Sequence, residues 1–347
     1  MVTNVVRLAD DDFEQSLAEA AKIIKSGGLV VFPTETVYGL GADGTNPDAA
    51  VSIYKAKGRP ADNPLILHIA DPKDAEEYTY TSEAFYRLAE AFMPGPLTVV
   101  MPSKPSVPKE TRAGLDTVAV RCPADKIANK LIRMAGVPIA APSANLSGSP
   151  SPTCSRHVID DMLGRVDMII DGGNCDFGLE STIVKIVSDK ELLLLRPGKI
   201  TPEDLRECGF SVEIASAVTG ALKEGEKPLS PGMKYRHYAP KAPVFLFEGN
   251  GPELVSYLKN EASSKVGLIW YSEEIEEITS AFPDITVLDF GSKFDLNAQA
   301  HNLFEILRRA DEYGFERIYA PLPEKSGIAL ALYNRMIRAA AHQIIRK

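Results

Sequence analysis

Positive charge is concentrated at the end of one predicted helix. Lys55 and Lys57 lie in its last turn, Arg59 follows directly, and Asn63 and His68 come soon after. Lysine offers a movable point charge and arginine a planar fork, so together they can neutralise a polyphosphate. Cations at a helix C-terminus also compensate the helix dipole, which is a common structural role. The spacing alone leaves both interpretations open.

Two predicted loops combine small residues with hydroxyl and amide side chains. The segments are Pro33–Gly41 (PTETVYGLG) and Ala140–Gly148 (AAPSANLSG), and each follows a predicted strand. Backbone N–H groups in such loops can approach phosphate oxygens, and α/β folds place binding sites at strand ends. Ordinary polar turns have the same composition, and for the first segment the spacing by itself favours a turn.

Three further features allow binding roles without requiring them. Arg121 closes the apolar run TVAVR and can hold a carboxylate with two hydrogen bonds, although an exposed strand end tolerates arginine without any role. His68 on its strand is more commonly a satisfied core histidine than a functional one. The cationic and aromatic segment Ser230–Pro240 suits either a cover over a nucleotide or a flexible connector.

The elements that must position these residues are short strands alternating with helices. Asn46 and Pro47 predict the start of a helix that ends at Gly58, and Thr201 predicts the cap of another helix. A third helix covers 85–92 and stops at Met93-Pro94-Gly95-Pro96. Predicted strands cover 28–32, 64–69, 97–101, 118–121, 137–141, 166–171, 182–187 and 192–196. This density of strands predicts a large mixed sheet covered by helices.

A second set of elements follows a linker in which the pattern of residues is lost, at about 217–243. Lysine and arginine outnumber acids there, namely Lys223, Lys227, Lys234, Arg236 and Lys241. Strands at 244–247, 266–271, 286–290 and 317–320 then alternate with helices near 253–260, 296–312 and 330–345. This βα alternation predicts a small doubly wound domain, and the absence of G-x-G-x-x-G from these residues gives no sign of a dinucleotide site in it. We therefore predict domains at 1–212 and 243–347, joined by an ordered linker at 213–242 that covers the active site.

Composition excludes several classes of protein. The chain has 347 residues, 45% of them hydrophobic, and a net charge of −9, with −5 in residues 1–200 and −4 in the rest. This acidity argues against a protein whose main task is to grip nucleic acid. No signal sequence or long apolar stretch is present in the sequence, so we expect a soluble, cytoplasmic protein. The four cysteines are isolated, which predicts reduced, structural thiols.

Nine segments taken in order resemble the YrdC-like threonylcarbamoyl-AMP synthases in their two-domain form. They are PTETVYGLG, KGR, NPLILHI, PGPLT, VAVRCP, APSANLSG, STIV, LRPG and SPGMKYRHYAP, and they span about 15–240. The resemblance implies an α/β fold with a YrdC-like domain on a large twisted mixed sheet and a smaller Rossmann-like C-terminal domain. It also implies a nucleotidyltransferase in which the threonine amine captures bicarbonate as a carbamate, which attacks the α-phosphorus of ATP and expels pyrophosphate.

The same resemblance implies roles for individual residues. Lys57 and Arg59 match the catalytic Lys-x-Arg that contacts the ATP phosphates, and Tyr238 matches the linker aromatic that closes over the nucleotide. The other residues implied for ATP are Asn63, Thr117, Ser143, Asn145, Ser151 and Arg196. Those implied for L-threonine are Thr36, His68, Arg121, Ala141 through its backbone, and Ser181. Mg²⁺ is expected on the ATP phosphates with no side-chain ligand, and no organic cofactor is expected.

Partners and rival functions follow from the same comparison. The product is expected to pass to a downstream tRNA threonylcarbamoyl transferase complex, with weak or absent direct tRNA binding and no membrane association. A non-catalytic YrdC-like RNA-binding or ribosome-assembly protein is the alternative, although the acidity and the retained Lys-x-Arg and Ser-x-Asn pairs weigh against it. The carbamoyl-transfer protein of hydrogenase maturation has C-x-x-C zinc fingers that this sequence lacks. As a hypothesis, the C-terminal domain supports the linker and is not a second enzyme.

Overall fold

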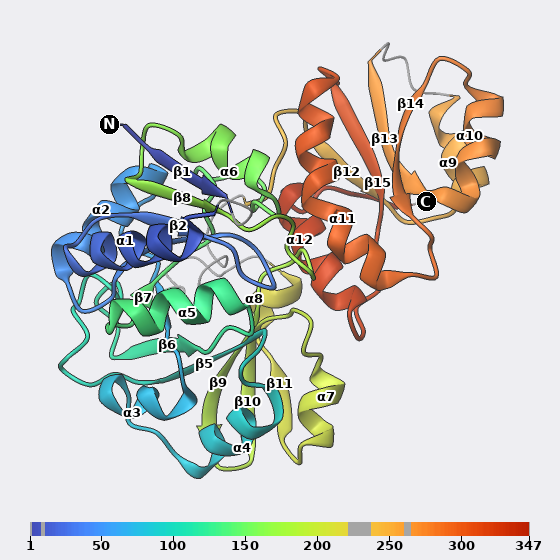
Figure 1. The fold of residues 1–347 in the computed structure, drawn as a ribbon. Coiled ribbons are helices and arrows are strands. Elements are labelled where there is room, and N and C mark those ends of the chain that lie inside the picture. The colour runs from blue at the N-terminus through green and yellow to red at the C-terminus, as the bar shows by residue number, and fades with distance from the viewer. Residues whose placement is uncertain (1, 8–10, 221–236, 260–264, 347) are drawn as a thin grey trace.

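The computed structural model describes residues 2–7, 11–220, 237–259 and 265–346, which form two α/β parts, each built on its own sheet (Figure 1). Most of the predicted linker, at 221–236, lies outside the described residues, and with it the cations Lys223, Lys227, Lys234 and Arg236. The predicted domain boundaries at 212 and 243 therefore stay predictions.

The first part contains an eleven-stranded mixed sheet with the order β1-β8-β2-β3-β7-β4-β6-β5-β9-β10-β11. Its strands are β1 (Asn4–Arg7), β2 (Val30–Phe32), β3 (Gly39–Asp43), β4 (Ile66–His68), β5 (Leu97–Pro102), β6 (Thr117–Arg121), β7 (Ile139–Ala140), β8 (Met168–Asp171), β9 (Thr182–Ser188), β10 (Glu191–Arg196) and β11 (Ser211–Ile214). The helices are α1 (Phe13–Lys25), α2 (Pro47–Lys57), α3 (Ala75–Tyr78), α4 (Glu83–Phe92), α5 (Lys126–Ala135), α6 (Ser155–Met162), α7 (Pro202–Glu207) and α8 (Ser216–Thr219), with a 3-10 turn η1 (Pro72–Asp74). The predicted large mixed sheet is confirmed.

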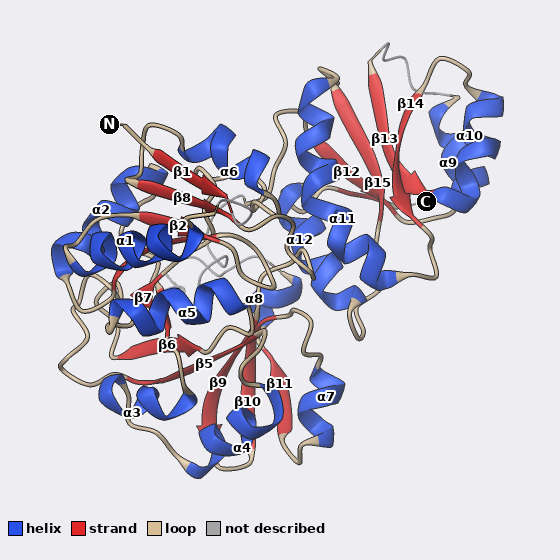
Figure 2. Ribbon diagram, in the orientation of Figure 1, coloured by secondary structure: helices blue, strands red, loops and turns tan. Residues whose placement is uncertain are grey.

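Helices cover both faces of this sheet because successive strand residues point to opposite sides. Val30 and Phe32 of β2 pack with α1 and α5, whereas Val31 packs in a different core with α2, α4 and α6. A strand buried on both faces reads as an unbroken apolar run, which is the pattern of GLVVF. The sheet therefore forms the central layer of the first part (Figure 2).

Local chemistry fixes the helix that carries the cation cluster. The Asn46 side chain accepts from the backbone N–H groups of Asp48 and Ala49, and Pro47 occupies the first turn. At the other end Gly58 adopts φ 61°, a left-handed conformation that glycine takes without steric cost. The predicted start and end of α2 are confirmed, so Lys57 lies in the last helical turn.

The second part contains a five-stranded, all-parallel sheet with the order β14-β13-β15-β12-β16. Its strands are β12 (Val244–Phe247), β13 (Val266–Tyr271), β14 (Thr286–Gly291), β15 (Arg317–Pro321) and β16 (Ile344–Ile345), and its helices are α9 (Gly251–Leu258), η2 (Ser272–Glu274), α10 (Ile275–Ala281), α11 (Leu296–Arg309), η3 (Ala310–Glu312) and α12 (Ala329–Ala339). Leu268 and Trp270 of β13 pack with α9 and α10, and Ile269 packs on the other side with α11 and α12. The predicted doubly wound arrangement is confirmed, with β15 inserted between β13 and β12.

Two local predictions were wrong. The segment PTETVYGLG is not wholly a turn, because Gly39 begins β3, which pairs with both β2 and β7. The predicted helix 330–345 ends at Ala339, and Ile344 and Ile345 form β16 beside β12. Pairing with distant strands overrides local pattern in both cases.

Helix α12 joins the two parts. All its residues are buried, because Leu330 belongs to the core of the first part while Leu332, Met336 and Ile337 belong to that of the second. A helix buried on all sides needs partners for its polar groups. Asn334 donates to the carbonyl oxygen of Val218 at 2.7 Å, and Arg338 donates to that of Ala217 at 2.6 Å.

Candidate active site

The centre of the first sheet brings several predicted residues together. His68 ends β4 and Arg121 ends β6, and parallel pairing sets these two residues directly opposite each other. Strand β7 runs antiparallel on the other side of β4, so the Ala141 N–H donates to the carbonyl oxygen of Ile66 at 2.9 Å. The predicted threonine residues His68, Arg121 and Ala141 therefore lie on adjacent strands.

One pocket opens at this place. Its lining contains ten of the fourteen predicted site residues: Lys57, Arg59, His68, Arg121, Ala141, Ser143, Asn145, Ser181, Arg196 and Tyr238. It also contains Thr34, Val37, Tyr38, Gly39, Ile66, Pro142, Ser147, Gly148, Glu180 and His237. Segments far apart in the chain thus form one polar, mainly cationic cavity.

The ammonium group of Lys57 is fully enclosed by loop oxygens. It donates to the carbonyl oxygen of Ser143, to that of Asn145 at 2.5 Å and to the Asn145 side-chain oxygen at 3.4 Å. None of these oxygens carries a charge. Burial, followed by the nearby Arg59 charge, lowers the pKa of Lys57 well below its usual value. An arriving anion would favour the charged form of this lysine.

Arg59 and Asn63 form a second polar group close to Lys57. Arg59 Nη2 donates to the carbonyl oxygen of Asn63 at 3.0 Å. The Asn63 side chain is completely buried, and its amide nitrogen and oxygen have no hydrogen-bond partner within the described part of the chain. Because buried polar atoms are normally satisfied, these two atoms are an exception close to the pocket, although Asn63 is not part of its lining.

Arg121 and His68 provide a different environment. Arg121 Nη2 lies 2.7 Å from Glu35 Oε1, and its Nε donates to the carbonyl oxygen of Gly95 at 3.3 Å. Burial, and then the Arg121 charge, lowers the pKa of His68 to about 3. The imidazole is therefore neutral at neutral pH beside a fixed guanidinium.

Two buried arginines, Arg196 and Arg335, contact Glu180 and Ser181. Arg196 donates from Nε to the Ser181 carbonyl oxygen and from Nη2 to its hydroxyl oxygen, both at 3.0 Å. Glu180 accepts from the Ser151 hydroxyl at 2.5 Å and from Arg335 Nε at 3.0 Å. Backbone packing here is close: a Cβ on Gly198 of the LRPG motif would lie 2.6 Å from the Thr182 nitrogen, so only glycine fits.

Tyr238 reaches the pocket from the end of the linker. Its ring stacks on Phe304 of α11 with centroids 5.1 Å apart, and the Ala239 N–H donates to the Gly148 carbonyl oxygen at 3.1 Å. Its φ of 63° is a strained conformation for a bulky residue, and such strain clusters at ligand sites. The second part of the protein therefore supports a wall of the pocket.

Four predicted residues lie outside the pocket lining. Thr36 is buried and its hydroxyl lies 2.8 Å from that of Thr34, which does line the pocket. Asn63 and Ser151 are hydrogen-bonded to lining residues: the Asn63 carbonyl oxygen accepts from Arg59, and the Ser151 hydroxyl donates to Glu180. Thr117 starts β6 while Arg121 ends it, which separates their Cα atoms by about 13 Å along the strand. The ligand roles of all fourteen residues stay predictions.

Sequence reasoning missed several residues of this site. Glu180 directly precedes the STIV segment and His237 lies within SPGMKYRHYAP, but neither was assigned a role. Glu35 was visible in PTETVYGLG, but its pairing with Arg121 was not. Arg335 had no signal, because one arginine in an amphipathic helix usually faces solvent.

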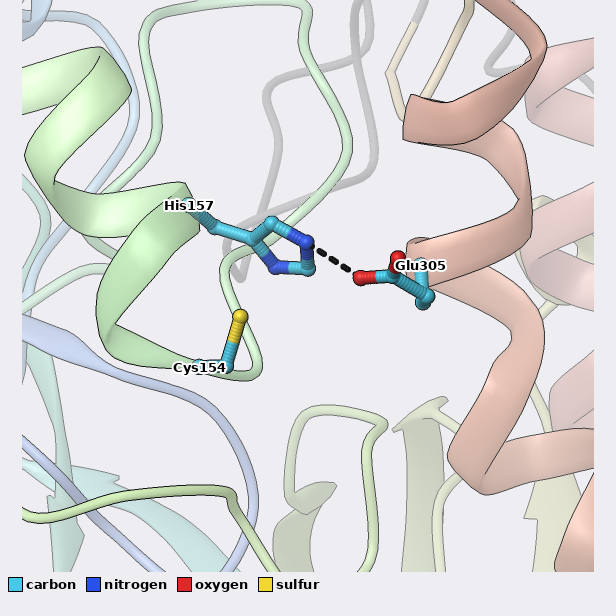
Figure 3. A group of neighbouring side chains, drawn as sticks. All are labelled: Cys154, His157 and Glu305. Carbon is cyan, nitrogen blue, oxygen red and sulfur yellow. Dashed lines mark hydrogen bonds and ion pairs between the residues drawn. The ribbon is translucent and has the colours of Figure 1, made fainter.

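The sequence motifs gave no sign of a group that combines Cys154, His157 and Glu305 (Figure 3). His157 Nε2 lies 2.6 Å from Glu305 Oε2, and its Nδ1 accepts from the Thr153 N–H at 3.3 Å. Because Nδ1 is an acceptor, Nε2 carries the proton and donates to Glu305, which leaves neither nitrogen free for a metal. We interpret this group as a contact between α6 and α11.

All four cysteines of the chain, each within the described residues, are unpaired, in agreement with the prediction.

Comparison with known proteins identifies the family. Residues 22–198 match a family model described as "Telomere recombination" (Sua5, YciO, YrdC), and residues 200–341 match "Threonylcarbamoyl-AMP synthase, C-terminal domain". The chain is 42% identical over 339 residues to the threonylcarbamoyl-AMP synthase of Bacillus subtilis, covering 96% of this chain and 95% of that protein. It is 41% identical over 357 residues to that of Pyrococcus abyssi, covering 99% and 100%. The chain belongs to the threonylcarbamoyl-AMP synthase family.

Solved structures agree with this family. The crystal structure of P. abyssi Sua5 complexed with L-threonine superimposes with a TM-score of 0.87 at 41% identity, covering 99% of each chain. Escherichia coli YciO, at 24% identity and a TM-score of 0.51, covers 58% of this chain and 99% of its own, and shows the fold of the first part alone. The predicted family and the predicted class, a threonylcarbamoyl-AMP synthase, are thus confirmed. No helix in the described residues is both long and apolar enough to span a membrane.

Proposed function

We propose that this threonylcarbamoyl-AMP synthase joins L-threonine, bicarbonate and ATP in the pocket described above. The observation that carries the proposal is the convergence of four cationic side chains, Lys57, Arg59, Arg121 and Arg196, on one cavity. A carboxylated amino acid and a triphosphate repel each other strongly. Fixed cations reduce this repulsion, and the low dielectric of a buried site strengthens their effect.

The threonine end of the pocket is assigned to the His68 and Arg121 strand ends. Arg121 is held rigidly by Glu35 and Gly95, so its remaining guanidinium nitrogen can be directed at the threonine carboxylate. Neutral His68 adds no charge that would compete with Arg121 for the carboxylate. The Ser181 hydroxyl, held by Arg196, is assigned to the amino acid as well.

The ATP end is assigned to the side of the pocket with Lys57 and Arg59. The carbamate forms when the threonine amine attacks bicarbonate and water leaves, and one carbamate oxygen then attacks the α-phosphorus while pyrophosphate departs. No covalent enzyme intermediate is needed. The cations hold both anions in line and stabilise the charge that develops on the phosphate oxygens.

Magnesium is assigned to the ATP phosphates. Glu180 is the only carboxylate among the described residues that line the pocket, and Ser151 and Arg335 already occupy its oxygens. Mg²⁺ commonly binds through one or two carboxylates together with substrate phosphates and water. This donor set therefore fits an ion carried by ATP with oxygens from Ser143 or Asn145 nearby, and it offers no dedicated protein cage.

The product is assigned to modification of a tRNA adenosine next to the anticodon, through a downstream transferase complex in the cytoplasm. A net charge of −9 favours weak or absent direct tRNA binding. The same acidity disfavours the alternative, a YrdC-like RNA-binding or ribosome-assembly protein.

The decisive experiment measures pyrophosphate release from MgATP with threonine, bicarbonate and Mg²⁺ each omitted in turn. We expect release to depend on all three. Release that continues without threonine would contradict the proposed reaction. Salt-sensitive RNA binding with no ATP turnover would favour the alternative.

A further inference from the structure

A fully buried arginine of the second part, Arg335, contacts Glu180 in the pocket wall. Arg335 of α12 donates from Nε to Glu180 Oε2 at 3.0 Å and from Nη1 to the Pro197 carbonyl oxygen at 2.7 Å. Its Nη2 lies 3.4 Å from the Glu180 carbonyl oxygen. Both acceptor residues belong to the first part: Glu180 precedes β9 and Pro197 follows β10, at the same end of this antiparallel strand pair. Arg335 therefore crosses the contact between the two parts. The residues that it binds, Glu180 and Pro197, are the chain neighbours of Ser181 and Arg196.

Glu180 is an unfavourable group for an anion site unless its charge is cancelled. Burial by itself would raise its pKa, but the charges of Arg335 and Arg196, together with hydrogen bonds from Ser151 and the backbone, outweigh burial and hold the pKa of Glu180 below its usual value. The carboxylate is thus ionised inside a pocket intended for a triphosphate. At low dielectric, one uncompensated negative charge would oppose ATP strongly.

Arg335 also lies over the ring of Tyr238, which lines the pocket. Its guanidinium carbon lies 5.9 Å from the centre of the Tyr238 ring, and Phe304 stacks on the same ring. The other carboxylate oxygen of Glu180, Oε1, accepts a hydrogen bond from the Ser151 hydroxyl. One guanidinium therefore interacts with Glu180 and the Tyr238 ring directly and with Ser151 through Glu180.

We propose that Arg335 is a positioning residue of the nucleotide site, which cancels the charge of Glu180 and fixes Ser151 and Tyr238 for ATP. The C-terminal domain is then a component of the active site as well as a support for the linker. The proposal rests on the function proposed above, since it assumes that ATP occupies this pocket.

The test compares Arg335→Gln with Arg335→Lys by calorimetric binding of MgATP and by steady-state kinetics. Arg335→Gln exposes ATP to the Glu180 charge, so we expect its Kd and KM for ATP to rise at least tenfold, with the KM for threonine within threefold. Arg335→Lys keeps the charge and should rescue most of the ATP affinity. If Arg335 has only a structural role, both variants should have a lower Tm, and their Kd and KM for ATP should be unchanged.

Glu305→Gln is the matched control, because it weakens the α6–α11 contact of the same interface away from the pocket. It should leave ATP binding within twofold of the wild type. A folded Arg335→Gln protein with wild-type ATP affinity overturns the proposal.

If Arg335→Gln does not fold, the double variant Glu180→Gln with Arg335→Gln replaces the ion pair by a neutral amide pair. ATP affinity within threefold of the wild type supports charge cancellation, and a tenfold loss overturns it. Failure of the proposed function is distinguishable, because wild-type protein itself would then show no binding of MgATP.

Discussion

The guanidinium of Arg121 and the carboxylate of Glu35 form a nearly buried ion pair, with Nη2 and Oε1 2.7 Å apart. Glu35 lies in the loop between β2 and β3, whereas Arg121 ends β6, where register places His68 beside it. Nε and Nη2 of Arg121 are engaged, which leaves Nη1 as the guanidinium nitrogen without a hydrogen bond in the described structure. The ion pair therefore orients Arg121 without occupying all three of its guanidinium nitrogens.

We predict that Arg121→Lys raises the KM for threonine by about 10- to 100-fold, because hydrogen bonds to a charged group are worth about 1.5–3 kcal/mol. Lysine retains the charge but cannot hold Glu35 and a carboxylate in one plane. Steady-state pyrophosphate release measures the effect, and the KM for ATP should change less than threefold. The exposed Arg87→Lys change is the control, and an unchanged KM for threonine in Arg121→Lys would refute the assignment.

Lys57→Ala and Arg59→Ala should each lose threonine-dependent pyrophosphate release, by about 10²- to 10³-fold in kcat. Both side chains supply positive charge where the triphosphate is expected. Lys55→Ala, on the exposed face of the same helix, is the control and should keep wild-type activity. Circular dichroism checks folding, and wild-type rates in both site variants would remove the phosphate assignment.

His68 should not titrate between about pH 5 and pH 8, because burial lowers its pKa to about 3. Nitrogen-resolved NMR of the imidazole should show a constant neutral form across this range. In urea the same residue should titrate near its usual value of 6.5. A folded-state midpoint above pH 6 would contradict the lowered pKa.

Glu35→Gln should reduce the dependence of stability on acid pH. Burial alone would raise the pKa of Glu35, but the Arg121 charge and hydrogen bond outweigh it, so the pKa lies below 4.5. A depressed carboxylate pKa stabilises the folded state fully above pH 4.5, and this stabilisation is lost as the pH falls through the folded-state value. Urea unfolding should therefore show the variant to be less stable at pH 7 by about 1–3 kcal/mol, with the difference shrinking in acid. A difference that stays constant with pH would argue against the ion pair.

Phe304→Leu should raise the KM for ATP by about 2- to 10-fold, because an aromatic pair is worth about 0.5–1.5 kcal/mol and this one holds Tyr238 in place. Phe290→Leu is the control, since Phe290 is equally buried in the same core but stacks on Tyr271. Equal ATP constants for the two variants would mean that the stacking does not support the nucleotide site.

Much of the fold follows from short-range patterns. The cap at Asn46, the end at Gly58 and the apolar runs of the strands each depend on a few neighbouring residues, so they were predicted correctly. Strand β3 and the end of α12 were mispredicted because pairing with β2, β7 and β12 decides them. Ten of the predicted site residues meet in one pocket because the motifs that contain them follow or precede central strands.

The order of the motifs in the sequence determined the family, the reaction class and the main cations, since each motif is local and keeps its residue types together. The tertiary structure alone decided which charges are compensated. Glu35 meets Arg121, and Glu180 meets Arg335, across 86 and 155 residues of chain. Such pairs form only when packing removes water and leaves a buried charge no other partner, and no local pattern in the sequence records that condition.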